Sequence, residues 1–356
     1  MNCTATHRHS IFCILPPGML HHVAEHGSAE QRARALRTLD SDHGLRMMRA
    51  TYQLLEAGAH KVFLASSPPT KQRTVYDAKQ GEGLPGRTVR AEGDPPVSDP
   101  AVNEAYDGLG ATFDFFQTAY GRNSIDDEGL HLDATVHYKQ RYDNAFWNGQ
   151  QMVFGDGDGD LFNRFTIAVD VIGHELAHGV TGDEIGLVYL GQSGALNESI
   201  SDVFGSLVKQ FAANQTADQA DWLIGAGLLA KGVHGVALRS MKAPGTAYDD
   251  ARLGGRDPQP AHLRDYLRTT SDNGGVHTNS GIPNHAFYLA AVALGGNAWE
   301  QAGHVWYETV TGGALHADAT FPRFAQLTVA TADRLYGAAA RKAVAEAWVG
   351  VGLVTS

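Results

Sequence analysis

Two histidines one helical turn apart carry the clearest chemical signal in the sequence. They stand in the run His174-Glu175-Leu176-Ala177-His178. On a helix, residues i and i+4 share a face, so both imidazoles can reach one metal ion. Glu175 lies one step round that helix and can hydrogen-bond a metal-bound water. A chance pair of surface histidines is the alternative, because the chain has 17 histidines.

Glu198 is the candidate for a third ligand. A catalytic zinc site takes three protein ligands and keeps one position open. Glu198 stands far enough beyond His174 for one helix to end and an antiparallel helix to begin. Asp202 shares its helix face and suits the second N–H of one ligating histidine, and Asn197 suits the other. Taken alone, these residues would sooner indicate a first helical turn, where the dipole favours negative charge.

A second cluster surrounds His277. Gly274 and Gly275 are adjacent and let the backbone turn tightly, which can present His277 to a cleft. Asp272 would hold the imidazole ring and raise its pKa. Taken alone, the cluster also fits a surface loop with an exposed histidine.

The elements that must position these residues fall into two halves. β-rich runs are expected first and helical periodicity dominates from residue 166 onward. The expected strands are 73–77, 88–91, 132–139 and 151–154, with one helix over 100–120. The expected later helices are 168–181, 196–210, 283–294, 298–309, 321–335 and 338–349.

The N-terminal part reads as a separate helical segment. Two short helices are expected, one over 18–26 and one beginning at the capping residue Ser28, with more helical pattern over 45–64. The polar, proline-containing stretch 66–73 predicts an exposed linker. A boundary is therefore expected between residues 48 and 72.

Composition excludes several classes of protein. The formal net charge of -11, without a basic run, argues against nucleic-acid binding. No apolar stretch reaches the roughly 18 residues of a membrane helix. No conventional signal peptide is visible. Cys3 and Cys13 are the only cysteines, so any downstream metal site must use histidines and carboxylates.

Several stretches together resemble the thermolysin-like neutral metallopeptidases, and more closely their protealysin-like branch with a short pro-segment. They keep family order from about Val75 to Leu353. The matching stretches are 144–147 (NAFW), 155–159 (GDGDG), 174–179 (HELAHG), 194–198 (GALNE), 237–241 (ALRSM) and 274–277 (GGVH). The resemblance implies an α+β fold with the zinc site in a cleft between two domains. It implies a pro-segment over 1–60, a β-rich domain over 61–170 and a helical domain over 171–356.

The resemblance also implies the roles of individual residues. His174, His178 and Glu198 match the zinc ligands, and Glu175 matches the general base. Tyr189 and His277 match the groups that stabilise the oxyanion, Asp272 the partner of that histidine, and Asp202 the carboxylate behind a ligand. The activity implied is hydrolysis of a peptide bond by a metal-activated water.

Substrate-binding residues follow from the same resemblance. Asn144 and Ala145 match an edge strand that binds the peptide backbone. Arg239 matches an arginine that contacts a substrate carbonyl and steadies the third ligand. An apolar pocket that prefers bulky apolar residues after the scissile bond is expected at Phe162, Phe165, Val171 and Leu238. Phe165 is bulkier than usual there, which leaves the depth of the pocket open.

One departure from the family concerns calcium. Better-known members bind two calcium ions beside the zinc. Asp170 and Asp221 are retained here, but Lys209, Leu223 and Ala226 stand where those members have glutamates. Because calcium needs about six to eight oxygen ligands, the double calcium site is expected to be absent. Lys209 is expected to form a salt bridge with Asp170 instead.

The stretch Ile14-Leu15-Pro16-Pro17 resembles the short pro-segment that fills the cleft until it is removed. A harmless N-terminal arm is the alternative, and a contact between the Cys13 thiolate and zinc is a further one. The expected partners are peptide or protein substrates and the pro-segment itself, in a monomeric protein. The resemblance implies secretion, with cytoplasmic retention as the alternative.

Two other functions are consistent with the motifs. A non-catalytic zinc protein would bind peptides or inhibit a partner, but it would usually have lost Glu175, Tyr189 or His277, and all three are present. An exopeptidase of related fold would need a charged group at the cleft mouth to bind a chain terminus, and none is identifiable.

Overall fold

The N-terminal half is built on a mixed sheet. The computed structural model describes residues 12–56 and 69–354, and within them a six-stranded sheet has the order β1-β5-β6-β4-β2-β3. β2, β4 and β6 are parallel, whereas β3, β5 and β1 are antiparallel to their neighbours. The strands are β1 (Phe12–Cys13), β2 (Arg73–Asp77), β3 (Arg87–Ala91), β4 (Leu132–Val136), β5 (Ala145–Trp147) and β6 (Met152–Phe154).

Helix α3 (Pro100–Tyr120) packs on this sheet and shows clear start and stop signals. The Asp99 side chain accepts a hydrogen bond from the Ala101 amide, and Pro100 occupies the first turn, where its missing N–H costs nothing. Gly121 ends the helix in the left-handed conformation, with φ 69°. The helix predicted over 100–120 is therefore confirmed.

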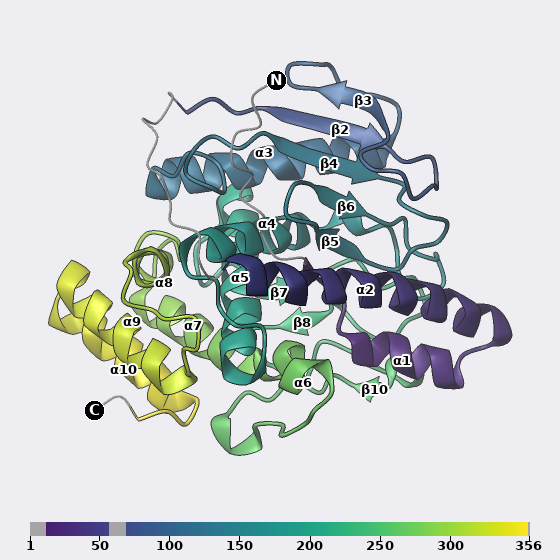
Figure 1. The fold of residues 1–356 in the computed structure, drawn as a ribbon. Coiled ribbons are helices and arrows are strands. Elements are labelled where there is room, and N and C mark those ends of the chain that lie inside the picture. The colour runs from purple at the N-terminus through teal and green to yellow at the C-terminus, as the bar shows by residue number, and fades with distance from the viewer. Residues whose placement is uncertain (1–11, 57–68, 355–356) are drawn as a thin grey trace.

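The C-terminal half is mainly helical (Figure 1). Its helices are α4 (Val169–Glu184), α5 (Gly191–Ala212), α6 (Asp272–Asn279), α7 (Gly281–Leu294), α8 (Ala302–Thr311), α9 (Phe321–Tyr336) and α10 (Ala338–Gly350). Short 3-10 helices cover Phe165–Ile167, Ala251–Leu253 and Leu263–Asp265. The pairs β7 (Leu223–Ile224) with β8 (Arg239–Ser240) and β9 (Asp249–Asp250) with β10 (Gly255–Arg256) complete it. The predicted α+β organisation is confirmed.

Helices α4 and α5 approach unusually closely, and two glycines make this possible. A Cβ atom on Gly205 would lie 2.3 Å from the Asp170 carbonyl oxygen and 3.0 Å from the His174 amide nitrogen. A Cβ atom on Gly173 would lie 3.1 Å from the Gly205 Cα atom. The two backbones can therefore meet beside His174, which brings the histidine motif of α4 against the acidic residues of α5.

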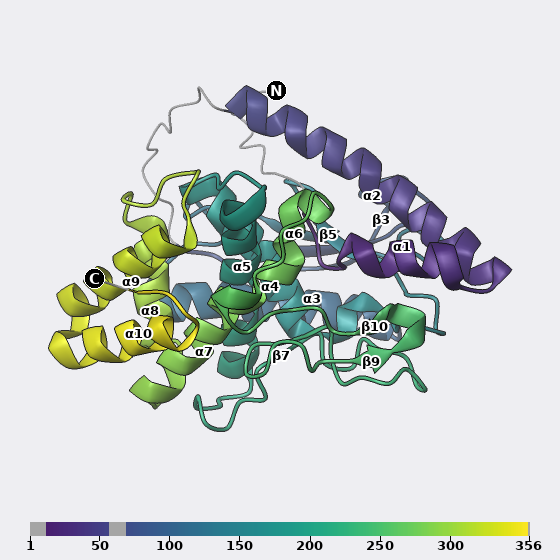
Figure 2. The ribbon, with the colours of Figure 1, turned by 90° about the horizontal axis from the view of Figure 1, so that it is seen from below.

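The N-terminal segment packs along one side of the molecule as α1 (Pro17–His26) and α2 (Ala29–Glu56) (Figure 2). Before them, β1 adds a strand to β5, with Cys13 opposite Phe146. The expected short second helix is wrong, because α2 continues to Glu56. It passes through Gly44, whose cost of roughly 1 kcal/mol a long helix tolerates.

Some elements had no usable pattern. β1 and β5 are only two and three residues long, too short for alternation to show. No helix was expected over 272–279, where a tight turn or a surface loop was considered. α6 is a short helix whose Asn273, Gly274 and Gly275 are left-handed. Residues 66–68 of the predicted linker 66–73 lie outside the described residues. Of the remainder, Pro69, Thr70 and Gln72 are exposed, whereas Arg73 is buried and begins β2. No described helix has both the length and the apolar character that crossing a membrane requires.

Candidate functional site

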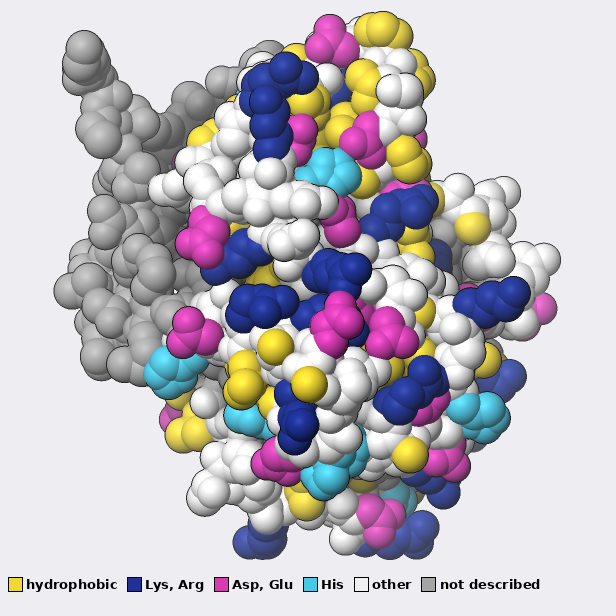
Figure 3. Space-filling model, turned by 90° about the vertical axis from the view of Figure 1, so that its right-hand side faces the viewer, with side chains coloured by type: hydrophobic (Ala, Val, Ile, Leu, Met, Phe, Trp, Pro, Cys, Tyr) yellow, Lys and Arg dark blue, Asp and Glu magenta, His cyan; other side chains and the backbone are white. Residues whose placement is uncertain are grey.

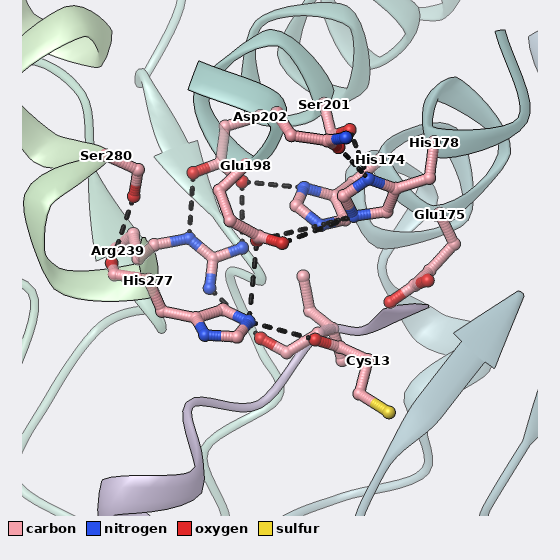
Figure 4. Close-up of polar contacts among 12 residues, drawn as sticks. Cys13, His174, Glu175, His178, Glu198, Ser201, Asp202, Arg239, His277 and Ser280 are labelled. Atoms are coloured by element: carbon pink, nitrogen blue, oxygen red, sulfur yellow. Dashed lines mark hydrogen bonds and ion pairs between the residues drawn. The ribbon is translucent and has the colours of Figure 1, made fainter. Parts of the chain in front are cut away.

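The three predicted ligands meet in the interior of the protein. His174 and His178 on α4 are fully buried, and their Nε2 atoms lie 3.0 Å apart. Glu198 on α5 places its Oε2 atom 3.6 Å from His174 Nε2 and its Oε1 atom 3.6 Å from His178 Nε2. The three ligand atoms all lie within 4.8 Å of one another (Figure 4). Side chains from two helices thus point at one position.

Hydrogen bonds fix both imidazole rings. The Asp202 carboxylate lies 2.8 Å from His174 Nδ1. The Asn197 amide oxygen lies 2.7 Å from His178 Nδ1, and the Ser201 hydroxyl lies 2.9 Å from it. Because the carboxylate and the amide oxygen can only accept, each Nδ1 carries the proton and each Nε2 keeps a lone pair for a metal. The contacts predicted for Asp202 and Asn197 are both present.

Asp202 is itself held by basic and amide groups. Arg239 donates to its two oxygens over 2.9 and 2.8 Å, and Asn284 donates over 2.8 Å. Burial alone would raise the Asp202 pKa, but the charge of Arg239 and the bond to His174 lower it well below its usual value. This carboxylate is therefore ionised and can support a metal-bound imidazole.

The donor set fits zinc. Two imidazoles and one carboxylate are the ligands of many catalytic zinc sites. Glu198 Oε2 is buried and has no hydrogen-bond partner among the described residues. A buried carboxylate oxygen without a donor is costly unless a cation compensates it. The thiol of Cys13 packs in a different cluster, with Tyr138, Tyr142, Phe146 and Val153.

Glu175 lies between the histidine helix and the sheet. Its Oε2 atom accepts a hydrogen bond of 3.1 Å from the Trp147 amide of β5. The side chain is fully buried, and its carboxylate extends toward the N-terminal strand (Figure 4). Glu175 therefore stands beside the ligand cluster without being one of its three members.

His277 and Tyr189 face the cluster from the opposite side. His277 Nδ1 lies 2.8 Å from Asp272 Oδ1, and its Nε2 lies 3.3 Å from the Tyr189 hydroxyl. Tyr189 also donates to Glu198 Oε1. Burial lowers the His277 pKa, but the charges of Asp272 and Glu198 raise it by more, so the net shift is upward. A protonated His277 can donate from both ring nitrogens.

The left-handed turn in α6 presents this histidine. Asp272, Asn273, Gly274 and Gly275 all have positive φ angles. A Cβ atom on Gly274 would lie 3.1 Å from the Gly191 backbone, so glycine is needed there for space as well as for conformation. The turn lets Asp272 bond both the ring and the amide of His277.

The backbone of the N-terminal segment lies in the cleft. The Ile14 amide donates to the Ala145 carbonyl over 3.2 Å, and the Leu15 amide donates to Asn144 Oδ1 over 3.2 Å. Arg239 Nη1 donates to the Ile14 carbonyl over 3.1 Å. Asn144, Ala145 and Arg239, which were predicted to bind substrate, thus contact the backbone of Ile14 and Leu15.

The four residues of the expected apolar pocket are all buried. Phe162 and Phe165 lie with their ring centroids 6.0 Å apart. Both belong to the main apolar cluster together with Val171 and Leu238, and Ile14 and Leu15 are members of the same cluster.

Helix α2 is linked to the cleft by polar groups that the sequence did not single out. Asp42 is fully buried and accepts from the Tyr142 hydroxyl over 2.6 Å and from Asn144 Nδ2 over 2.8 Å. Arg34 contacts Asp158 over 2.9 Å. At the end of the molecule where α1 and α2 join, basic side chains lie among acidic ones (Figure 3).

Further groups at the site were also missed. Ser201 contacts His178, and Asn284 contacts Asp202. The Trp147 amide contacts Glu175. Ser201 directly precedes Asp202 on the helix that carries Glu198, so its position in the sequence could have suggested a contact with a ligating histidine. Asn284 and Trp147 are brought in by the fold alone.

Comparison with known proteins gives a consistent result. The family model "Thermolysin metallopeptidase, catalytic domain" matches residues 34–182, and "Thermolysin metallopeptidase, alpha-helical domain" matches residues 185–353. An "Extracellular metalloprotease" of Pectobacterium carotovorum subsp. carotovorum is 53% identical over 96% of both chains. "Protease PrtS" of Photorhabdus sp. (strain Az29) is 48% identical over 96% of this chain and 91% of that one.

A solved structure is similar over nearly the whole chain. It is the "Precursor of Protealysin, Metalloproteinase from Serratia proteamaculans", with 56% identity and a TM-score of 0.87. The match covers 96% of this chain and 100% of that one, so it includes the N-terminal helices as well as the two-part body.

Proposed function

Because the chain belongs to the thermolysin family of metalloendopeptidases, we propose that His174, His178 and Glu198 hold the single zinc ion with which it hydrolyses peptide bonds. The observation that carries this proposal is the meeting of three buried ligand atoms within 4.8 Å. When bound, zinc supplies Lewis-acid polarisation and lowers the pKa of a water molecule.

Three residues around the ligands have separate roles in the reaction. Glu175 takes the proton of the attacking water and passes it to the nitrogen of the leaving amine. His277 and Tyr189 donate hydrogen bonds to the carbonyl oxygen as negative charge develops on it. Their mutual distance of 3.3 Å allows both to face one oxygen atom. No covalent intermediate is required.

The substrate backbone is held by the contacts that now hold residues 13–15. Ala145 and Asn144 bind it as an added strand, and Arg239 binds a carbonyl on the leaving side. Arg239 also bonds Asp202 behind the ligand His174. This shared arginine connects substrate binding with the orientation of the metal ligands.

A product map is the first test of specificity. The apolar set Phe162, Phe165, Val171 and Leu238 should favour Leu, Ile or Phe immediately after the scissile bond. One methylene in such a pocket is worth about 1–3 kcal/mol. The value of kcat/KM should therefore rise stepwise among substrates that carry Ala, Val or Leu at the position after the scissile bond. Sequencing the products of casein and of a matched peptide series measures this. A map dominated by cuts before charged residues would refute the apolar preference.

The second part of the proposal is that the chain is made as a zymogen. The peptide-binding groups of the cleft are occupied by residues 13–15, and α2 is anchored by Asp42 to Asn144. A tethered segment acts at an effective concentration near the millimolar range, so even moderate intrinsic affinity keeps a cleft filled. The similarity to a precursor structure that includes these helices supports the same reading.

Asp42→Ala should weaken this inhibition. It leaves the buried Tyr142 hydroxyl and Asn144 amide without their acceptor, a cost of about 1–3 kcal/mol to the inhibited state. The uncleaved chain should therefore hydrolyse a small fluorogenic peptide roughly five to a hundred times faster. Asp40→Ala, at an exposed position of the same helix, is the matched control. Equal rates for both variants would show that Asp42 does not hold the segment in place.

The third part concerns calcium. Lys209 Nζ lies 2.8 Å from Asp170 Oδ2 and 2.8 Å from Asp221 Oδ1, so the predicted contact with Asp170 is present. Burial lowers the Lys209 pKa, but the two carboxylates raise it by more. An ammonium that fills this position makes a double calcium site unnecessary, and we propose that the protein does not use one.

EGTA should therefore leave the melting temperature and activity nearly unchanged. Lys209→Glu should destabilise the calcium-free protein by about 3 kcal/mol, because the buried Asp170 would lose its cation and face a second carboxylate, with the half-exposed Asp221 beside them. Lys209→Met is the control, because it removes the contacts of the ammonium group without adding a negative charge. It should lower the free energy of unfolding by less than Lys209→Glu does. A clear rise in the melting temperature of the unmodified protein on adding calcium would contradict this account.

Secretion is the remaining proposal. The Pectobacterium relative is described as extracellular, and so is the "Extracellular minor metalloprotease" of Serratia marcescens. Immunodetection of the protein in culture medium, against a cytoplasmic marker, tests this directly.

A further inference from the structure

The backbone from Cys13 to Leu15 makes a complete set of peptide contacts across the candidate active site. The Cys13 carbonyl oxygen lies 3.2 Å from His277 Nε2. The next residue donates its amide to Ala145 and accepts from Arg239 through its carbonyl. Figure 4 shows the Cys13 oxygen directed at His277 and its sulfur directed away from the ligand cluster.

These contacts define a register. The carbonyl that faces His277 is the one on which an oxyanion would develop, and it belongs to Cys13. The nitrogen that follows belongs to Ile14 and lies on the leaving side, where Arg239 holds the next carbonyl. The bond between the Cys13 carbon and the Ile14 nitrogen therefore occupies the position of a scissile bond.

Neighbouring groups agree with this register. Phe12 pairs with Trp147, whose amide donates to the general base Glu175 over 3.1 Å. Ile14 is apolar and fully buried, so its side chain is of the kind proposed for the position after the cut. The segment is thus presented as a substrate would be, with its chain direction antiparallel to β5.

We propose that the Cys13–Ile14 peptide bond is a substrate of the protein's own active site and is hydrolysed slowly within the same chain. The inference rests on the proposed function. One water is consumed, the C–N bond breaks, Cys13 gains a carboxylate and Ile14 gains an amine. The proton removed from the water by Glu175 passes to the Ile14 nitrogen.

Two features make this reaction slow and limited to one turnover. The residues after the bond continue through Pro16 into α1, so the new amine stays close to the new carboxylate and the reverse reaction competes. The product also places an ammonium at the fully buried Ile14 position, which is costly in an apolar environment. Because the new ammonium at Ile14 is unfavourable when buried, the cut segment should bind the cleft less tightly than the intact one.

The test uses the intact, zinc-loaded chain. Intact mass and N-terminal sequencing over time should reveal a fragment 1–13 and a new N-terminus at Ile14. The rate should not depend on protein concentration, because the reaction is intramolecular. Glu175→Gln should abolish the cut, Ile14→Asp should suppress it, and Ile14→Leu should keep it at the same bond.

A measurement without catalysis tests the register. In zinc-free protein, the amide hydrogens of Ile14 and Leu15 should exchange far more slowly than in the Ile14→Asp variant. Exchange at the rate of a free peptide would overturn the inference. So would hydrolysis of an unrelated peptide by the same sample without any cut at Cys13–Ile14, an outcome that leaves the proposed function intact. Absence of both reactions in the intact chain would likewise overturn the inference, and only a failure to hydrolyse the peptide after the pro-segment has been removed would count against the proposed function.

Discussion

Replacing Glu175 with glutamine should lower kcat for peptide hydrolysis by about three or more orders of magnitude, the order that a lost general base and proton carrier can cost. Glutamine keeps the size of the side chain and can still contact the Trp147 amide through its oxygen. What it loses is the ability to take a proton from water. KM should change little, because the backbone contacts of Asn144, Ala145 and Arg239 are untouched.

The zinc content of the variant separates this role from that of a ligand. Glu175 is not among the three residues whose ligand atoms converge, so Glu175→Gln should bind zinc as the unmodified protein does. Glu346→Gln, at an exposed position far along the chain in α10, is the control for the chemical change itself. Substantial remaining activity, or a loss of zinc, would show that Glu175 has another role.

The ligand set could be predicted because local rules govern its spacing. His174 and His178 share a helix face by periodicity, and Asp202 shares a face with Glu198 for the same reason. The helix of His174 and the helix of Glu198 could then be predicted to lie antiparallel, because the chain between them is long enough for a turn. The glycine contact between Gly173 and Gly205, which allows that pairing, had no visible signal in the sequence.

Groups that arrive from distant parts of the chain were predictable only by resemblance or not at all. Periodicity says nothing about Arg239 reaching Asp202, and nothing marked Asn284 as its neighbour. Asp42 is one of four carboxylates in a polar helix. Only the packing of α2 against the cleft turns it into a buried acceptor for Asn144.

The N-terminal segment illustrates a related limit. Separate helical stretches were expected before residue 40 and over 45–64, yet α2 runs unbroken from Ala29 to Glu56, because a single glycine costs a long helix only about 1 kcal/mol. The pairing of β1 with β5 involves only Phe12 and Cys13 of the segment, a run too short for an alternating pattern to mark it as a strand. Resemblance placed this segment in the cleft, whereas its register required the structure.

The chain's activity should depend entirely on one bound zinc ion. Catalytic zinc is held by three protein ligands, and the described residues offer one such set, His174, His178 and Glu198. Without the ion, the remaining groups have neither an activated water nor a cation to polarise the carbonyl. His174→Ala should therefore lose both zinc and activity. Phenanthroline should stop peptide hydrolysis that EGTA leaves intact.

Titration of the metal-depleted protein with zinc tests this claim most directly. After removal of the pro-segment, the rate at which a small peptide substrate is hydrolysed should start near zero. It should then rise in proportion to added zinc and level off at one ion per chain. Full activity in protein shown by elemental analysis to be free of zinc, or a plateau that requires a second ion, would contradict the account.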